Sequence, residues 1–296
     1  MTPASLVNIG AMMEKNALGQ TRVSPRVSYN HHLSPRNTLR AAVSVAYRNP
    51  EMLEELGNRY FLLGKVGAIQ YRWRDILAAG GLGPEHALSR EVGYVGQLDE
   101  AGSILDVRAY HDHISDIIWV DPVVDPTSVV TPRSFKSDFN ATYSGVEGTL
   151  NYKVGARSKV TVNYAHQIAS ARPSRIASTP AVNSSLIGFA YQYRLTVPLN
   201  SASLLVSHDF PGGLQVGVGF YHIDPVRILD GAALQPLTRY LDLRVAQRFG
   251  TWRNKEGGTG GELALVVQNA LNDHFFDYNT NITGKRRAYL TAALGF

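Results

Sequence analysis

Apolar and polar residues alternate with a period of two along most of this chain. Reading back from Phe296, every second residue is apolar as far as Ala288, and the residues between them are small or partly polar. Soluble domains usually let their terminal residues fray, yet here the pattern runs to the last residue. An apolar-out alternation of about ten residues is typical of a strand in a membrane β-barrel. The C-terminal segment is therefore predicted to be a membrane strand.

The same alternation recurs throughout the chain. About twelve segments share it, at 6–14, 22–32, 38–48, 88–98, 103–119, 140–154, 159–167, 201–210, 214–221, 240–248, 262–270 and 287–296. If each link is a hairpin, neighbouring strands run in opposite directions. The pattern predicts an all-β fold, an antiparallel transmembrane β-barrel meander of about twelve strands.

The links between these segments alternate between two kinds. Short links with turn residues lie at 33–37, 99–102, 155–158 and 211–213, and long ones lie at 49–87, 120–138, 171–200, 226–238 and 271–285. A looser glycine-rich turn at 250–261 is the exception. Short turns on one side and long loops on the other are typical of a barrel inserted from one side. Residues 51–56, at the start of the longest link, are expected to form one or two helical turns.

Composition excludes some chemistry and leaves the barrel prediction intact. The chain has 296 residues and no cysteine, which rules out disulfides and thiolate metal sites. Mean hydropathy is −0.12, but lipid-facing residues of a barrel are diluted by lumen-facing ones, so hydropathy does not detect them. The net charge of +5 fits contacts with anionic lipid headgroups or with an anionic ligand, and it does not distinguish them.

Four ordered segments resemble the barrel motifs of TonB-dependent outer-membrane receptors. The residues that carry the resemblance are Ser24-Pro25-Arg26, Leu39-Arg40 and Tyr47-Arg48-Asn49-Pro50 in the first segment, Glu91-Val92-Gly93-Tyr94 in the second, Asn269-Ala270-Leu271-Asn272-Asp273 in the third, and Arg287 to Phe296 in the last. The four segments occur in the family's order and at similar separations, and the resemblance covers essentially the whole chain. The resemblance implies that residues 1–296 are the C-terminal portion of a receptor barrel in the bacterial outer membrane.

That family also has a plug domain, an energy-coupling box and a 22-stranded barrel, so the resemblance implies a partial barrel without a plug. Met1-Thr2-Pro3-Ala4-Ser5 does not read as a signal peptide. A truncated gene, a pseudogene remnant, a wrongly assigned start and a split protein all stay open. A cut sheet would leave two unpaired edges, which are costly in hydrocarbon, unless about twelve strands close into a narrower barrel.

The resemblance implies a parent function of energised uptake of an iron–siderophore or similar metal chelate. It implies as partners outer-membrane lipid and lipopolysaccharide, the barrel-assembly machinery, the chelate ligand, and TonB through the missing plug and box; no nucleic acid and no cofactor are expected. In the family, the closing strand is read by the assembly machinery, which here makes Phe296, Leu294 and Leu290 the expected assembly signal.

The longest link carries the candidate ligand contacts. Arginine mixed with aromatic residues suits an anionic ligand, and the candidates are Arg59, Tyr60, Arg72, Trp73 and Arg74. The alternative is an amphipathic segment that packs on its own barrel.

Metal and enzyme chemistry find little support. His111 and His113 share one strand face, a spacing compatible with a metal, but no third ligand follows, so no metal site is expected. The alternative is a complete small outer-membrane barrel of another class, an autotransporter translocator or a barrel hydrolase. Ser207 and His208 are adjacent and therefore point to opposite faces, and no nucleophile-elbow or zinc-protease motif occurs. No catalytic residue is predicted, and the protein is not expected to be an enzyme.

Overall fold

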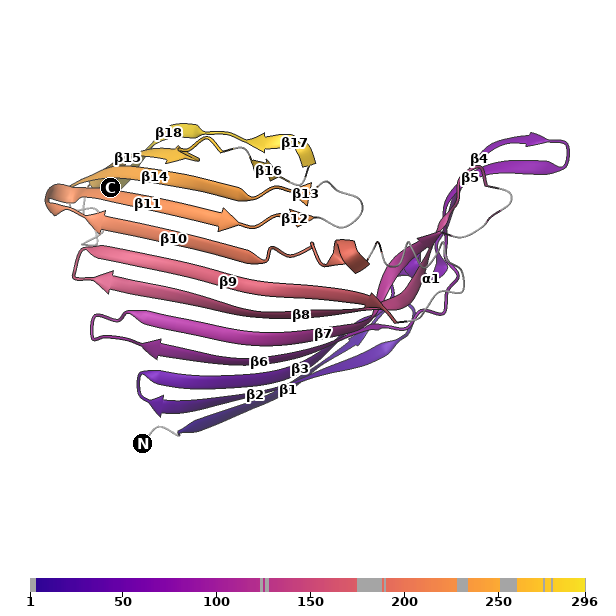
Figure 1. The fold of residues 1–296 in the computed structure, drawn as a ribbon, viewed down its shortest axis with the longest axis horizontal. Coiled ribbons are helices and arrows are strands. Elements are labelled where there is room, and N and C mark those ends of the chain that lie inside the picture. Colours follow the sequence, from indigo (N-terminus) through magenta and orange to yellow (C-terminus); the bar gives the residue numbers. More distant parts are fainter. Residues whose placement is uncertain are drawn as a thin grey trace.

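The computed structural model describes residues 4–122, 125, 128–174, 188, 190–227, 234–250, 260–273, 275–277 and 279–295. They form a large antiparallel sheet in which twelve strands follow one another as a meander (Figure 1). The strands in order are β1 (Ser5–Lys15), β2 (Thr21–Ser34), β3 (Asn37–Arg48), β6 (Glu85–Gln97), β7 (Ile104–Pro122), β8 (Arg133–Val154), β9 (Ser158–Pro173), β10 (Asn200–Asp209), β11 (Leu214–Ile223), β14 (Thr238–Gly250), β15 (Gly260–Gln268) and β18 (Arg287–Gly295). The predicted all-β meander is confirmed, and each of the predicted segments lies on one of these strands.

The sheet is open rather than closed. Among the described residues, β1 pairs only with β2, and β18 pairs only with β15. The two strands therefore form opposite edges of a curved sheet (Figure 1). This arrangement confirms a partial barrel.

The predicted short turns gather at one end of the sheet and the long connections at the other, where the short β1–β2 turn at 16–20 also lies (Figure 1). Two of the short turns depend on glycine, because Gly155 and Gly212 adopt φ values of 62° and 82° that side chains with a Cβ disfavour. Helix η1 (Pro211–Gly213) forms one of these turns. The two-sided distribution of links is as predicted.

The longest link contains more structure than its sequence suggested. It begins with helix α1 (Met52–Leu56), where a helical turn was predicted, and continues as a hairpin of β4 (Asn58–Val66) and β5 (Ile69–Leu77). This hairpin, which was not predicted, stands away from the main sheet (Figure 1). Two smaller strand pairs lie in later links, β12 (Val226–Arg227) with β13 (Leu234–Gln235) and β16 (Phe275–Asp277) with β17 (Asn279–Gly284).

The register gives the twelve strands two distinct faces. One face, termed the inner face, lines a cavity of about 770 Å³ whose walls come from β2 to β11 and include Arg40, Asp106 and Glu147. The opposite, outward face carries exposed apolar side chains such as Val43 and Val146. An apolar outward face and a polar inner face are the arrangement of a membrane barrel wall. No helix among the described residues is long and apolar enough to cross a membrane.

A hydrophobic cluster of buried residues lies at the loop end of β7 and β8. Phe139 is fully buried, and its ring meets the edge of Trp119 with 5.1 Å between centroids. Ile117, Ala141 and Ala190 complete the cluster.

Candidate functional site

The hairpin β4–β5 brings three of the five candidate ligand residues together. A bulge after Arg59 sets Tyr60 opposite Arg74. The guanidinium groups of Arg72 and Arg74 lie over the Tyr60 ring, 5.0 and 5.3 Å from its centroid. Cations at this distance are attracted by the negative face of the ring. Tyr60, Arg72 and Arg74 therefore form one cationic–aromatic face of the hairpin.

The two arginines of this face have different roles. Arg74 forms an ion pair with Asp125, with 2.8 Å between Nη1 and Oδ2, and only 11% and 6% of the two side chains are exposed. The backbone N–H of Arg74 donates to Ser128 Oγ at 3.1 Å, which ties the base of the hairpin to the next link. Arg72 has only a weak contact, from Nη2 to Gln70 Oε1 at 3.4 Å, and no carboxylate partner among the residues described. Arg72 is thus the cation of this face that a ligand could use.

Arg59 and Trp73 lie apart from this face. The Arg59 Nε donates to both carboxylate oxygens of Asp75, at 3.0 and 2.9 Å, and this hydrogen bonding lowers the pKa of Asp75. Trp73 pairs with Phe61 across the hairpin, and the two residues are 51% and 62% exposed. The sequence candidates thus divide into a cationic–aromatic face, a neutralised ion pair and an apolar surface.

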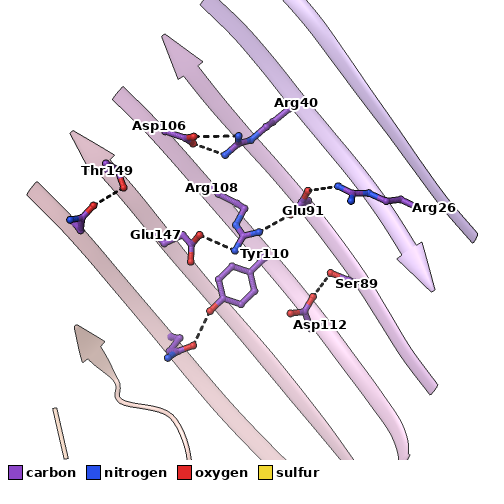
Figure 2. A network of polar contacts seen from close by, with 12 residues as sticks. Arg26, Arg40, Ser89, Glu91, Asp106, Arg108, Tyr110, Asp112, Glu147 and Thr149 are labelled. Carbon is purple, nitrogen blue, oxygen red and sulfur yellow. Dashed lines mark hydrogen bonds and ion pairs between the residues drawn. The ribbon is translucent and has the colours of Figure 1, made fainter. Parts of the chain in front are cut away.

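The inner face carries a network of ion pairs across five strands, which Figure 2 shows from close by. Arg108 donates to Glu91 Oε2 at 3.0 Å and approaches Glu147 Oε1 at 2.8 Å. Arg26 approaches the other oxygen of Glu91 at 3.7 Å. Arg40 donates from Nη1 to Asp106 Oδ2 at 3.3 Å, so three arginines are balanced by three carboxylates.

A belt of neutral side chains continues this network. Tyr110 donates to Gln167 Oε1 at 3.0 Å, Thr149 donates to Asn163 Oδ1 at 2.8 Å, and Asn163 donates to Ser203 Oγ at 2.9 Å. These side chains pair mainly with one another, which suits a rigid polar surface rather than a reaction centre. Sequence reasoning did not find these pairs, although the alternation places each member on the inner face.

The other predicted residues fall on the outward face. Leu290 and Leu294 are 71% and 64% exposed there, and Phe296 lies outside the described residues. His111 and His113 also face outward, whereas Asp112 faces inward and accepts from Ser89. Within the described part of the chain, no three histidine, cysteine or acidic residues gather as a metal site would require.

Comparisons with known proteins agree with this geometry. The family described as "TonB dependent receptor-like, beta-barrel" matches residues 7–270. No curated protein matches the sequence.

Several solved structures are similar in fold. A variant of the ferric enterobactin receptor PfeA of Pseudomonas aeruginosa aligns with a TM-score of 0.67 and 14% identity, covering 100% of this chain and 43% of that one. The siderophore receptor PirA of Acinetobacter baumannii gives 0.67 and 16% over 98% of this chain and 43% of that one. The ferric-catecholate import receptor Fiu of E. coli K12 gives 0.61 and 16%, with coverages of 93% and 35%. The chain therefore spans less than half the length of these structures.

Proposed function

Because the chain belongs to the TonB-dependent receptor family through its β-barrel domain, we propose that residues 1–296 form the C-terminal portion of a barrel for energised uptake of an iron–siderophore or similar chelate. The family consists of outer-membrane transport receptors rather than enzymes. The proposal gives the chain the barrel wall and the outer loops of such a receptor. Coupling to TonB would run through a plug and box supplied by the rest of the receptor.

The cationic–aromatic face of the hairpin β4–β5 is the observation that carries the ligand proposal. Ferric catecholates combine negative charge with aromatic rings, and PfeA and Fiu are named as receptors for ferric enterobactin and for a ferric catecholate. Arg72 offers an uncompensated charge beside the Tyr60 ring. The guanidinium of Arg74 also lies over the Tyr60 ring and helps to fix its position. Trp73 adds apolar area on the opposite face of the hairpin. Arg59 has a smaller role because Asp75 neutralises it.

The outward face supports the remaining partners of the proposal. Its exposed apolar side chains suit contact with outer-membrane lipid, and the adjacent loops suit contact with lipopolysaccharide. Leu290 and Leu294 extend outward from the last strand, where, with Phe296, they would be read by the barrel-assembly machinery.

Binding of a ferric catecholate to the refolded chain tests the ligand proposal. We expect Arg72→Gln to weaken binding, measured by quenching of tryptophan fluorescence in an uncharged detergent, by about tenfold or more, as for loss of one charged hydrogen-bonding partner. Arg157→Gln is the matched control, since it removes the same charge from a short turn at the opposite end of the sheet. Equal affinities for the unmodified chain and the Arg72→Gln variant would contradict the role given to this hairpin.

A further inference from the structure

Acidic side chains of the sheet lie on its inner face, where arginines accompany them, and the outward face lacks them over the regularly paired stretches of the described strands. Apart from irregularities beside the β2–β3 turn and at the loop end of β7 and β8, the pairing register keeps its parity from β1 to β18, so the face of each regularly paired residue is fixed. On the inner face lie acidic residues of seven strands, namely Glu14, Glu85, Glu91, Asp106, Asp112, Glu147, Asp209, Asp242 and Glu262. None of the outward positions of the twelve described strands, over the stretches that this register covers, is aspartate or glutamate.

Most of the histidines lie on the outward face. Of the nine histidines in the chain, His274 lies outside the described residues and His32 faces inward. The other seven face outward, at His31, His86, His111, His113, His166, His208 and His222. A lipid-facing wall gives no reason for so many basic side chains unless they lie at the level of the headgroups, because charge costs least there.

Three of these basic side chains form a compact patch on β6 and β7. Arg90 lies directly across the strand pair from His111, and His113 is the next outward residue on β7. Residues directly opposite in an antiparallel pair have Cβ atoms about 5 Å apart. Arg90 and His111 are exposed. We name Arg90, His111 and His113 the outward basic patch.

The patch lies where the apolar wall ends. On the turn side of it the outward residues are apolar, with Val92 on β6 and Val107 and Ala109 on β7. On the loop side β7 reaches the bulge at Ile114–Ile117, which contains Asp116. On β6 and β7 the patch occupies the first charged or imidazole positions on the loop side of these apolar residues, with Leu88 facing outward opposite His113. Such positions at the end of an apolar band are where lipid headgroups meet a barrel.

Hydroxyl groups of the neighbouring strand orient both imidazoles. The Nδ1 of His111 lies 2.8 Å from Ser144 Oγ, and the Nδ1 of His113 lies 3.3 Å from Thr142 Oγ1. With each Nδ1 used in this way, Nε2 is left as the ring nitrogen for an external partner. Within the described part of the chain, neither ring is within 4 Å of a carboxylate, and Arg90 has no ion-pair partner. When the two hydroxyls donate to Nδ1, each Nε2 carries the ring proton, and Arg90 and both rings then present N–H donors outward without a counter-charge.

We propose that the outward basic patch binds the phosphate group of an anionic lipid headgroup in the membrane leaflet on the loop side. Arg90 supplies a permanent charge with parallel N–H donors, which suit phosphate oxygens. The two Nε2 atoms supply further donors along the strand. The rim around His222 and Arg239 is a weaker candidate, because His222 is paired with Asp224 at 3.0 Å.

This inference rests on the membrane placement in the proposed function and is independent of its iron-chelate ligand. The test uses the full chain refolded in an uncharged detergent, with its β-structure verified by circular dichroism. Dihexanoyl phosphatidylglycerol is titrated as the probe, with dihexanoyl phosphatidylcholine as the zwitterionic comparison and inorganic phosphate as the free-anion comparison. Binding is followed by calorimetry.

The decisive comparison is between two triple variants that lose the same residue types. The first is Arg90→Gln, His111→Gln and His113→Gln; the control is Lys15→Gln, His31→Gln and His208→Gln, which removes one permanent cation and two histidines from outward positions elsewhere. We expect phosphatidylglycerol affinity to fall at least about fivefold in the first, as for loss of one cation near an anionic membrane surface, and less than about twofold in the control. The unmodified chain should bind phosphatidylcholine more weakly than phosphatidylglycerol.

Equal losses in the two variants would overturn the proposal, since the attraction would then be spread over the whole outward face. Binding of inorganic phosphate as tight as that of phosphatidylglycerol would also overturn it, in favour of a free-anion site. If the patch variant fails to refold, single Arg90→Gln and His111→Gln variants are compared in the same way. Binding of the ferric catecholate by the patch variant reports on the hairpin separately, so failure of one proposal is distinguishable from failure of the other.

Discussion

At the scale of single residues, neighbours in sequence have quite different surroundings. Arg72 and Arg74 share a strand face, yet Arg74 is locked to Asp125 while Arg72 keeps a largely unused guanidinium. The sequence grouped these residues because arginines and aromatic residues alternate there. It could not separate them, because Asp125 comes from another link and its position depends on the fold.

The pair Arg59–Asp75 allows a prediction on pH. The hydrogen bond from Arg59 lowers the pKa of Asp75, so the attraction is fully present above the ordinary pKa of an aspartate and is lost as pH falls through the lowered value. We expect Arg59→Gln to return the pKa of Asp75 toward its ordinary range, as measured by carboxyl-carbon NMR titration. Lys65→Gln, a charge loss at the tip of the same hairpin, should leave the titration of Asp75 nearly unchanged. An unchanged pKa in Arg59→Gln would contradict the direct pairing.

At the scale of elements, alternation identified the main strands and missed the outer hairpin. Neither face of the twelve-stranded sheet forms a conventional core. One face meets lipid and the other meets the lumen, so apolar and polar residues alternate with a regular period of two. Strand β4 breaks that period with Tyr60, Phe61, Leu62 and Leu63 in succession, and bulges interrupt its pairing with β5. A continuous apolar run does not reveal strand or loop by periodicity alone. The inner-face ion pairs were missed for a related reason, since they depend on cross-strand register.

The packed end of β7 and β8 should contribute more to stability than the lipid-facing wall. Phe139 is fully buried against Trp119, so Phe139→Ala should lower the free energy of unfolding by about 3–5 kcal/mol. Val146→Ala on the same strand faces outward and is 48% exposed, so its loss should be below about 1 kcal/mol. Urea unfolding in detergent, followed by tryptophan fluorescence, measures both. Similar losses in the two variants would show that the cluster is not a folding core.

At the scale of the whole molecule, the two open edges set the behaviour of the isolated chain. Every residue of β1 is exposed, and most of β18 is too. Unpaired N–H and C=O groups along such edges cost several kcal/mol each in hydrocarbon unless another strand pairs with them. Three arrangements would satisfy these backbone groups: pairing with the rest of a larger barrel, pairing with a second copy of the chain, or closure of β1 on β18. The family match and the fold similarity to larger receptor barrels favour the first.

Single cysteines test this on a chain that has none of its own. Ile9 on β1 is 80% exposed at the open edge, so the purified Ile9→Cys chain should form disulfide-linked dimers readily as edges of separate molecules pair. Val162→Cys is the matched control, because it faces outward from β9, which is paired on both sides. Dimer formation on non-reducing gels should therefore be much faster for Ile9→Cys. Equal rates, together with heat-modifiable migration of the monomer, would instead show that twelve strands close into a narrow barrel of their own, since a closed barrel has no free edge to offer.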